Sequence, residues 1–296
     1  MKKSGLFLLL AFGGFGAAAQ SANPLTARLE NVKLTVALTA GGQPPYAVTY
    51  HQQSVVNPSR LGTPLADGKG FDGPLVIVGS EIKNVDDFWQ PVLNKGQSIR
   101  NHYQQLTVHL RQAAALSRRL DVVFRVFAEG VGFRYEFPKQ PNLQYFVVAD
   151  ELTEFALPAD HKAFWIPGDY DTNEYAYTVS KLSEVDNTQL VKSSTAIAVR
   201  EAPDAQTVAS PLMLKTADEL YINIHEAAQV DYPAMQLHVD RASHRLVPNA
   251  GGTKTCLHAP SHTPWRTLIV NDKATDILAS KLILNLNEPN RIGETS

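Results

Sequence analysis

The chain has 296 residues, in which 27 Lys and Arg stand against 29 Asp and Glu, so its formal net charge is −2. Near-balanced charge without a basic cluster argues against a nucleic-acid partner. The single cysteine, Cys256, excludes an internal disulfide, and we interpret it as a small buried hydrophobic side chain.

The N-terminal segment has the pattern of a secretory signal peptide. Lys2 and Lys3 precede an uncharged stretch over residues 5–18, and three alanines end at Ala19. This apolar run is shorter than the roughly 20 residues of a membrane-spanning helix. We therefore predict a signal peptide over residues 1–19 and export to a periplasm or the extracellular medium. No later segment is apolar and uncharged for long enough to predict a membrane span.

Apolar residues alternate with polar ones along much of the remaining chain, which predicts half-buried strands. Leu106, Val108 and Leu110 illustrate the pattern. The residues AEGVG at 128–132 predict a hairpin connection in which Gly130 and Gly132 supply positive φ angles. The predicted strands cover residues 32–38, 46–50, 75–78, 106–111, 120–126, 133–137, 195–199, 220–226, 235–239 and 265–270.

Helical periodicity is nearly absent. The one helix candidate covers residues 275–284, a run that can equally be strand-like. Strands and helices do not alternate as a parallel barrel would require. The fold class we predict is all-β, a single large sandwich over residues 20–290 followed by a short exit segment over residues 291–296.

No local catalytic signature, such as a phosphate-binding loop or a paired-cysteine zinc motif, is present. Glu226 is nevertheless unusual, because the alternation of Leu220, Ile222 and Ile224 places it on the apolar face of its strand. A buried carboxylate without a partner is costly. Glu226 must therefore lie at a solvated strand end, pair with a cation or backbone donors, or bind a metal or ligand.

A second polar segment, WIPGDYDTNEYAY at residues 165–177, combines aromatic rings with oxygen-bearing side chains. The oxygens of Asp169, Asp171, Asn173 and Glu174 suit a hard cation such as calcium, although the spacing is not that of an EF-hand. Aromatic faces next to carboxylates and amides suit sugar hydroxyls. The alternative is a turn in which Asp and Asn bond to their own backbone.

Several phrases of the chain resemble glycoside hydrolase family 97, a group that includes exported, calcium-using α-glucosidases and α-galactosidases. They are GFRYEFP at 132–138, IHEAA at 224–228 followed by DYPAM at 231–235, PWRT at 264–267, and LASKLILNLNEP at 278–289. Their order and spacing make the combined resemblance more specific than any one phrase.

The resemblance implies an N-terminal β-super-sandwich of the galactose-mutarotase type, a (β/α) barrel that carries the catalytic carboxylates, and a small C-terminal β domain. Only the sandwich is expected here, so residues 291–296 would begin a linker to a missing barrel, and the chain would hold no catalytic residue. The resemblance also implies carbohydrate as ligand and a glutamate that completes a calcium site. Glu174 is the first match for that ligand and Glu226 the second.

Three hypotheses follow. The first is the sandwich domain of a family 97 enzyme that acts on terminal α-linked sugars. The second is a stand-alone exported carbohydrate-binding module with a platform of Trp165, Tyr170, Tyr175 and Tyr177. The third is an inactive structural fragment with an exposed apolar face where a barrel would dock.

Overall fold

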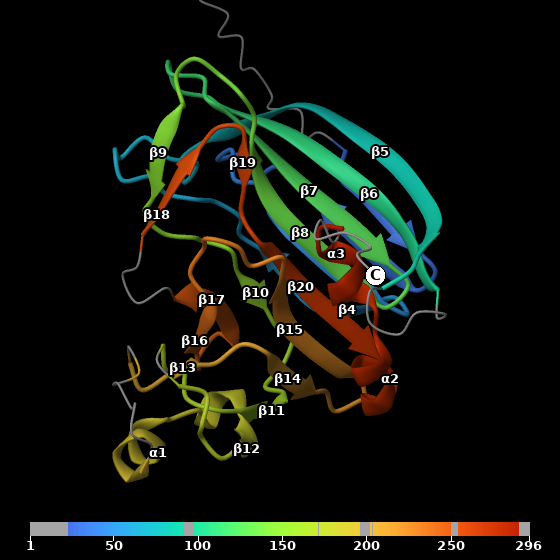
Figure 1. Ribbon diagram of the computed structural model, residues 1–296, viewed down its shortest axis with the longest axis vertical. Helices are drawn as coiled ribbons and strands as arrows, with labels where there is room; N and C mark the ends of the chain where they lie inside the picture. Colours follow the sequence, from blue (N-terminus) through green and yellow to red (C-terminus); the bar gives the residue numbers. More distant parts are fainter. Residues whose placement is uncertain are drawn as a thin grey trace, which may run out of the picture.

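A computed structural model describes residues 23–91, 98–170, 172–195, 202, 204–249 and 254–289. It confirms the all-β class: two large antiparallel sheets face each other, and a two-stranded ribbon closes one end (Figure 1). In the described part of the chain no helix is long and apolar enough to cross a membrane. The predicted signal peptide, Asp171 and most of the strand predicted at 195–199 lie outside the described residues.

The first sheet has eight strands in the order β1-β2-β3-β4-β10-β17-β16-β13. Alternation dictates which face is buried: Val32, Leu34 and Val36 point into the core while Lys33 is exposed. The strands are β1 Leu25–Leu29, β2 Val32–Val36, β3 Tyr46–Tyr50, β4 Gln53–Ser59, β10 Phe155–Ala156, β13 Thr207–Val208, β16 Gln236–Asp240 and β17 Arg245–Asn249.

The second sheet has ten strands in the order β12-β11-β14-β15-β20-β8-β7-β6-β5, with β19 paired to β8. Two of its strands are much longer than the usual five or so residues. The strands are β5 Leu75–Trp89, β6 Ile99–Gln112, β7 Arg119–Phe127, β8 Gly130–Phe137, β11 Lys162–Trp165, β12 Thr178–Lys181, β14 Leu212–Lys215, β15 Tyr221–Ala227, β19 Ser261–His262 and β20 Trp265–Asn271.

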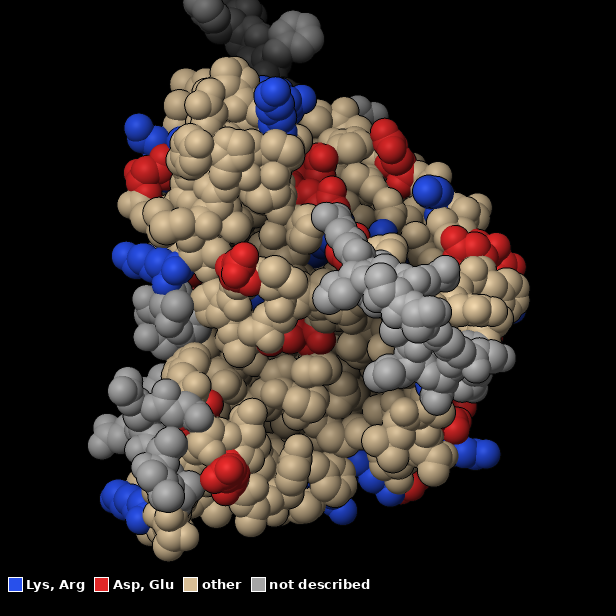
Figure 2. All heavy atoms as spheres, in the orientation of Figure 1, with Lys and Arg blue, Asp and Glu red and all other residues tan. Residues whose placement is uncertain are grey.

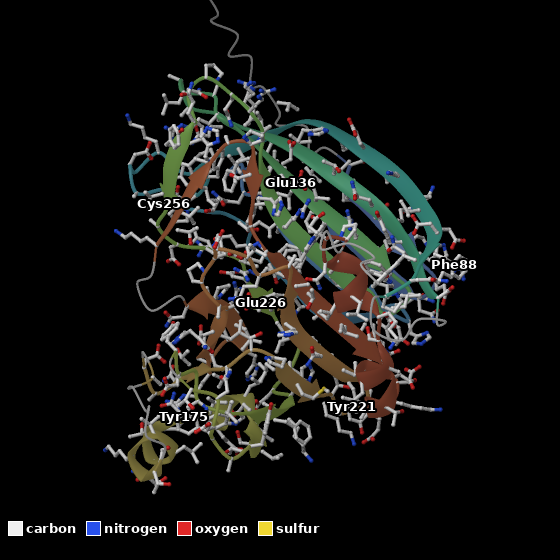
Figure 3. The ribbon with its side chains drawn as sticks, viewed as in Figure 1. Phe88, Glu136, Tyr175, Tyr221, Glu226 and Cys256 are labelled. Carbon is white, nitrogen blue, oxygen red and sulfur yellow. The ribbon has the colours of Figure 1, made fainter. Side chains whose placement is uncertain are left out.

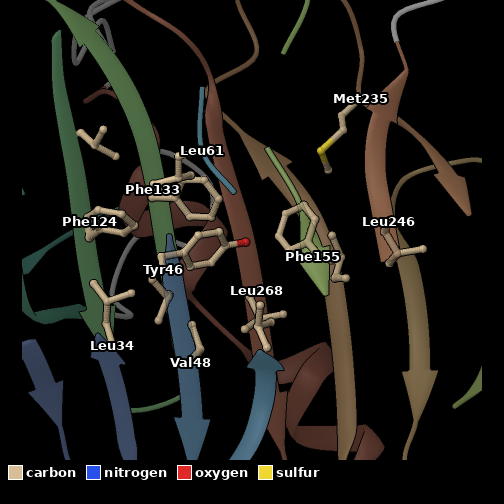
Figure 4. Close-up of a cluster of buried hydrophobic side chains, with 14 of the residues drawn as sticks. Leu34, Tyr46, Val48, Leu61, Phe124, Phe133, Phe155, Met235, Leu246 and Leu268 are labelled. Atoms are coloured by element: carbon tan, nitrogen blue, oxygen red, sulfur yellow. The ribbon is translucent and has the colours of Figure 1, made fainter. Parts of the chain in front are cut away.

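Aromatic side chains from both sheets meet in the core (Figure 4). The ring centroid of Phe133 on β8 lies 4.9 Å from that of Tyr46 on β3, 5.5 Å from that of Phe124 on β7 and 6.2 Å from that of Phe155 on β10. Tyr46 is fully buried, and its hydroxyl donates to the carbonyl of Glu154 at 2.6 Å. Each buried aromatic side chain contributes about 3 kcal/mol or more to stability.

The helix candidate over residues 275–284 is helical rather than strand-like, but the structure divides it into two short helices, α2 (Ala274–Ala279) and α3 (Leu282–Leu286). Ser280 is extended at the break, where the Glu129 carboxylate accepts bonds from Ser280 Oγ at 2.8 Å and from the Lys281 N–H at 3.2 Å. Away from these two, a 3-10 turn covers Leu182–Glu184 and α1 covers Thr188–Ser193.

The hairpin glycines have different roles. Gly130 has a φ of +153°, as predicted, but Gly132 is not among the residues with positive φ. Gly132 instead leaves room for Leu286 of α3, whose side chain would overlap any Cβ at that position. The prediction for Gly132 is wrong because a glycine is needed there for the packing of a distant segment, not for the backbone conformation of the turn.

The interpretation of Cys256 as buried is wrong, because it is exposed. It lies on β18 (Thr255–His258), which pairs with β9 (Tyr145–Val148) in the ribbon (Figure 3). Exposure alternates along β18, so one face of the ribbon is solvated. Figure 2 shows charges of both signs scattered over the face it presents, without a continuous basic patch.

Candidate functional site

Glu226 lies on β15 and is only 7% exposed, on the apolar face that alternation predicted (Figure 3). Its Oε2 accepts a hydrogen bond from Arg266 Nη1 at 2.5 Å, and its Oε1 accepts one from the backbone N–H of Met235 at 3.1 Å. Of the three possibilities that the sequence left open, the structure therefore has the second, an ion pair with a backbone donor.

Arg266 on β20 also holds a second carboxylate, that of Glu151. Arg266 donates two parallel hydrogen bonds to Glu151, from Nε to Oε1 at 2.9 Å and from Nη2 to Oε2 at 2.6 Å. Such bidentate pairs are the strongest of the charge-assisted hydrogen bonds. Thr153 Oγ1 adds a bond to Glu151 at 2.8 Å. Glu151, Arg266 and Glu226 thus form a buried cluster, called here the arginine cluster, that carries two carboxylates for one guanidinium.

The two carboxyl groups of the arginine cluster respond differently to burial. Burial alone would raise the pKa of Glu151, but the charge and hydrogen bonds of Arg266, with further bonds from Thr153 and Tyr232, keep it below its ordinary value. Burial raises the pKa of Glu226 above its ordinary value, because Arg266 offsets only part of the desolvation and Glu151 adds repulsion. One guanidinium cannot compensate both carboxylates fully.

Arg266 was not among the residues predicted for the site, although the sequence carries a signal for it. Arg266, Leu268 and Val270 are spaced two residues apart and therefore share one face of their strand. Arg266 thus places a cation on an apolar face, just as Glu226 places an anion on the apolar face of the neighbouring strand. Glu151, in the loop after β9, had no such local signal. Arg266 and Glu151 are 115 positions apart in the chain and meet only in the folded protein.

Glu151 and Arg266 of the arginine cluster line a pocket between the β9–β18 ribbon, the loop before β16 and the end of β17. The Tyr232 ring covers the guanidinium, with Arg266 Cζ 5.7 Å from the ring centroid. The pocket is small, with a volume of about 30 Å³. The lining residues are Val148, Asp150, Glu151, Tyr232, Pro233, Ala234, Met235, Pro248, Asn249, Thr255 and Arg266.

Glu174 lies in the loop between β11 and β12 and is exposed. The loop is tied down on both sides of it: the Tyr175 hydroxyl donates to Asp169 Oδ2 at 2.8 Å, and the Tyr170 hydroxyl donates to the carbonyl of Asn249 at 2.6 Å. Since Asn249 lines the pocket, the loop that carries Glu174 is anchored at the pocket's wall. Burial raises the pKa of Tyr170 to about 12, so its hydroxyl stays protonated.

The structure does not join the two predicted metal ligands. Figure 3 shows Tyr175, the neighbour of Glu174, well apart from Glu226. Within the described residues no group of three or more His, Cys, Asp or Glu side chains could hold a metal ion. Asp169, another candidate, is buried.

The predicted aromatic platform is not continuous. Trp165 is 2% exposed and donates from Nε1 to Ser180 Oγ at 3.1 Å, so its face cannot meet a sugar in solution. Tyr177 is well exposed, and Tyr170 is partly so. A binding surface that needs Trp165 is therefore excluded.

The model of the glycosyl-hydrolase 97 N-terminal family matches residues 29–289. The chain belongs to this family. The resemblance inferred from the sequence is thereby confirmed. The arginine cluster and the Glu174 loop both lie within the matched residues.

Among the relatives of this domain is a retaining alpha-galactosidase of Bacteroides thetaiotaomicron, 24% identical over an alignment that covers 100% of this chain and 46% of that protein. Among solved structures, a family 97 enzyme of a Pseudoalteromonas strain in complex with panose is 29% identical with a TM-score of 0.79, covering 91% of this chain and 39% of the enzyme. The same enzyme is known in complex with acarbose. The chain thus spans less than half the length of the alpha-galactosidase and of the Pseudoalteromonas enzyme.

Proposed function

We propose that this chain is the N-terminal domain of an exported family 97 glycoside hydrolase that acts on terminal α-linked sugars. The family match over residues 29–289 carries the proposal. The relatives named as a retaining alpha-galactosidase and as an enzyme in complex with panose and acarbose support the sugar class. The division into a signal peptide over 1–19, a sandwich over 20–290 and a linker from 291 belongs to the same proposal.

Catalysis would need a second domain. Hydrolysis of a glycosidic bond generally uses two carboxyl groups placed on either side of it. Glu151 and Glu226 are instead both bonded to Arg266. We therefore assign the arginine cluster a structural role: it holds β15, β20 and the loop after β9 together. We assign the catalytic carboxyl groups to a barrel domain that is not part of this chain.

Glu174 is the residue of this domain that we assign to a calcium site shared with that barrel. Its exposed position on an anchored loop supports this role, whereas both oxygens of Glu226 already accept hydrogen bonds. One carboxylate does not hold calcium, which takes six to eight oxygen ligands. The described residues alone thus do not fit a complete site, and most ligands would come from the barrel.

The test joins this chain to the catalytic domain of the Bacteroides thetaiotaomicron relative and measures hydrolysis of a chromogenic α-galactoside against calcium concentration. We expect Glu174→Gln to raise the half-saturating calcium concentration about tenfold, because the number of charged ligands sets calcium affinity. Glu219→Gln is the matched control, since Glu219 is 73% exposed and pairs with Lys215 on the surface.

An unchanged calcium requirement in Glu174→Gln would remove Glu174 from the site. The unjoined chain, titrated by calorimetry with calcium, maltooligosaccharides and α-galactosides, is expected to give no heat and to hydrolyse nothing. Saturable sugar binding by the unjoined chain would instead support the stand-alone binding module.

A further inference from the structure

The ten-stranded sheet ends in a long edge strand. Within the described part of the chain, β5 is hydrogen-bonded to β6 alone, and it is the last strand in the sheet order (Figure 1). Such an edge presents backbone N–H and C=O groups that can pair with another strand. Residues 80–84 are all exposed, and the Ile82 side chain, an apolar group, is 52% exposed.

The central part of β5, GSEIKNV at residues 79–85, is complementary to itself when two copies run antiparallel. With Ile82 of one copy opposite Ile82 of the other, each Glu81 faces Lys83 of the second copy. Opposite charges at directly facing positions stabilise a strand pair, and like charges destabilise it. Glu81 lies 3.5 Å from Nε2 of His109 on β6, but its side chain is 77% exposed and can still meet a lysine of a second copy.

The charges also select this register. A shift of two residues in one direction places Lys83 opposite Lys83, and a shift in the other direction places Glu81 opposite Glu81. Both shifts keep the faces of the two sheets continuous, so they are the relevant competitors. The β-bulge between Ile77 and Gly79 marks the end of the regular segment. The favourable register is therefore confined to residues 79–85.

We propose that the chain forms a two-fold dimer in which residues 79–85 of β5 pair antiparallel with the same segment of a second copy. Two ten-stranded sheets then join edge to edge, through backbone hydrogen bonds, two Glu81–Lys83 pairs and one Ile82–Ile82 contact. A single strand pair buries less than the roughly 1,200 Å² of a standard interface, so the dimer forms at micromolar or higher concentration. This proposal is independent of any sugar or calcium site.

Sedimentation velocity of the purified chain, up to about 100 µM, tests the proposal. We expect twice the mass of one chain at the highest concentrations. In the Lys83→Glu variant, each of the two Glu81–Lys83 pairs becomes a pair of facing carboxylates. We expect this repulsion to raise the dissociation constant of the dimer about tenfold or more. The double variant Glu81→Lys, Lys83→Glu swaps the charges and is expected to restore dimerisation. The control is Lys33→Glu, which changes an exposed lysine on β2 of the other sheet. We expect this variant to dimerise as the native chain does.

Hydrogen exchange supplies an independent readout, since the amides of residues 79–85 are expected to gain protection as the concentration rises. A chain that stays monomeric throughout would overturn the proposal. So would a dimer that Lys83→Glu does not weaken, or a double variant that remains as monomeric as Lys83→Glu while still folded by circular dichroism.

Discussion

Replacement of Arg266 by Met is expected to lower the free energy of unfolding by about 3–5 kcal/mol at neutral pH, because it leaves buried carboxylates without their cation. Glu151 and Glu226 are 6% and 7% exposed, and Arg266 is the cation that bonds to both. Met keeps much of the volume of the arginine stem, so the loss reflects charge more than packing. Urea unfolding followed by tryptophan fluorescence measures the change.

The pH dependence separates the charge effect from a packing effect. In the native protein the pKa of Glu151 lies below its unfolded value, so its contribution to stability is present above the unfolded pKa and is lost as the pH falls through the folded pKa. The pKa of Glu226 is raised, so its contribution is present at low pH and is lost as the pH rises through the folded pKa. Without Arg266, burial raises both pKa values, and both carboxyl groups follow the second pattern.

The deficit of Arg266→Met is therefore expected to be smaller at about pH 5 than at about pH 8. Adding Glu226→Gln to Arg266→Met is expected to recover part of the loss. Arg100→Met is the matched control, because Arg100 forms a two-bond pair with Asp86 on the surface, and exposed pairs contribute little. A deficit that does not change with pH would assign the loss to packing.

Gly130→Ala is expected to destabilise the domain by about 3 kcal/mol or more, through backbone overlap and a strained φ angle. Gly130 pairs with Ile269 of β20 and with Phe127 of β7, in the middle of the ten-stranded sheet. A Cβ at Gly130 would overlap the carbonyl oxygen of Leu268. Since backbone cannot yield as a side chain can, β8 and β20 would have to separate locally.

Gly73→Ala is the control for this substitution, since a Cβ there meets nothing within 4 Å and its φ is not positive. We expect Gly73→Ala to unfold at the urea concentration of the native protein or slightly above it, because alanine restricts the unfolded chain. Equal midpoints for Gly130→Ala and Gly73→Ala would mean that the β8–β20 ladder tolerates a side chain at residue 130.

Local pattern was sufficient for much of the fold. The predicted strand at 46–50 coincides with β3, and that at 265–270 with most of β20. The placement of Glu226 on a buried face also followed from alternation. A strand repeats every two residues, so burial of one side chain fixes the face of its neighbours along the same strand.

Contacts between distant segments decided the rest. The pairing of Arg266 with Glu151, the break between α2 and α3 opposite Glu129, and the fit of Leu286 over Gly132 each join parts of the chain far apart in sequence. Alternation states which residues share a face but not which strand or loop lies across from them. The sequence by itself thus determined the all-β class, the main strands and the family resemblance. Only the tertiary structure decided which groups compensate the buried charge of Glu226, because register and loop path bring those groups together.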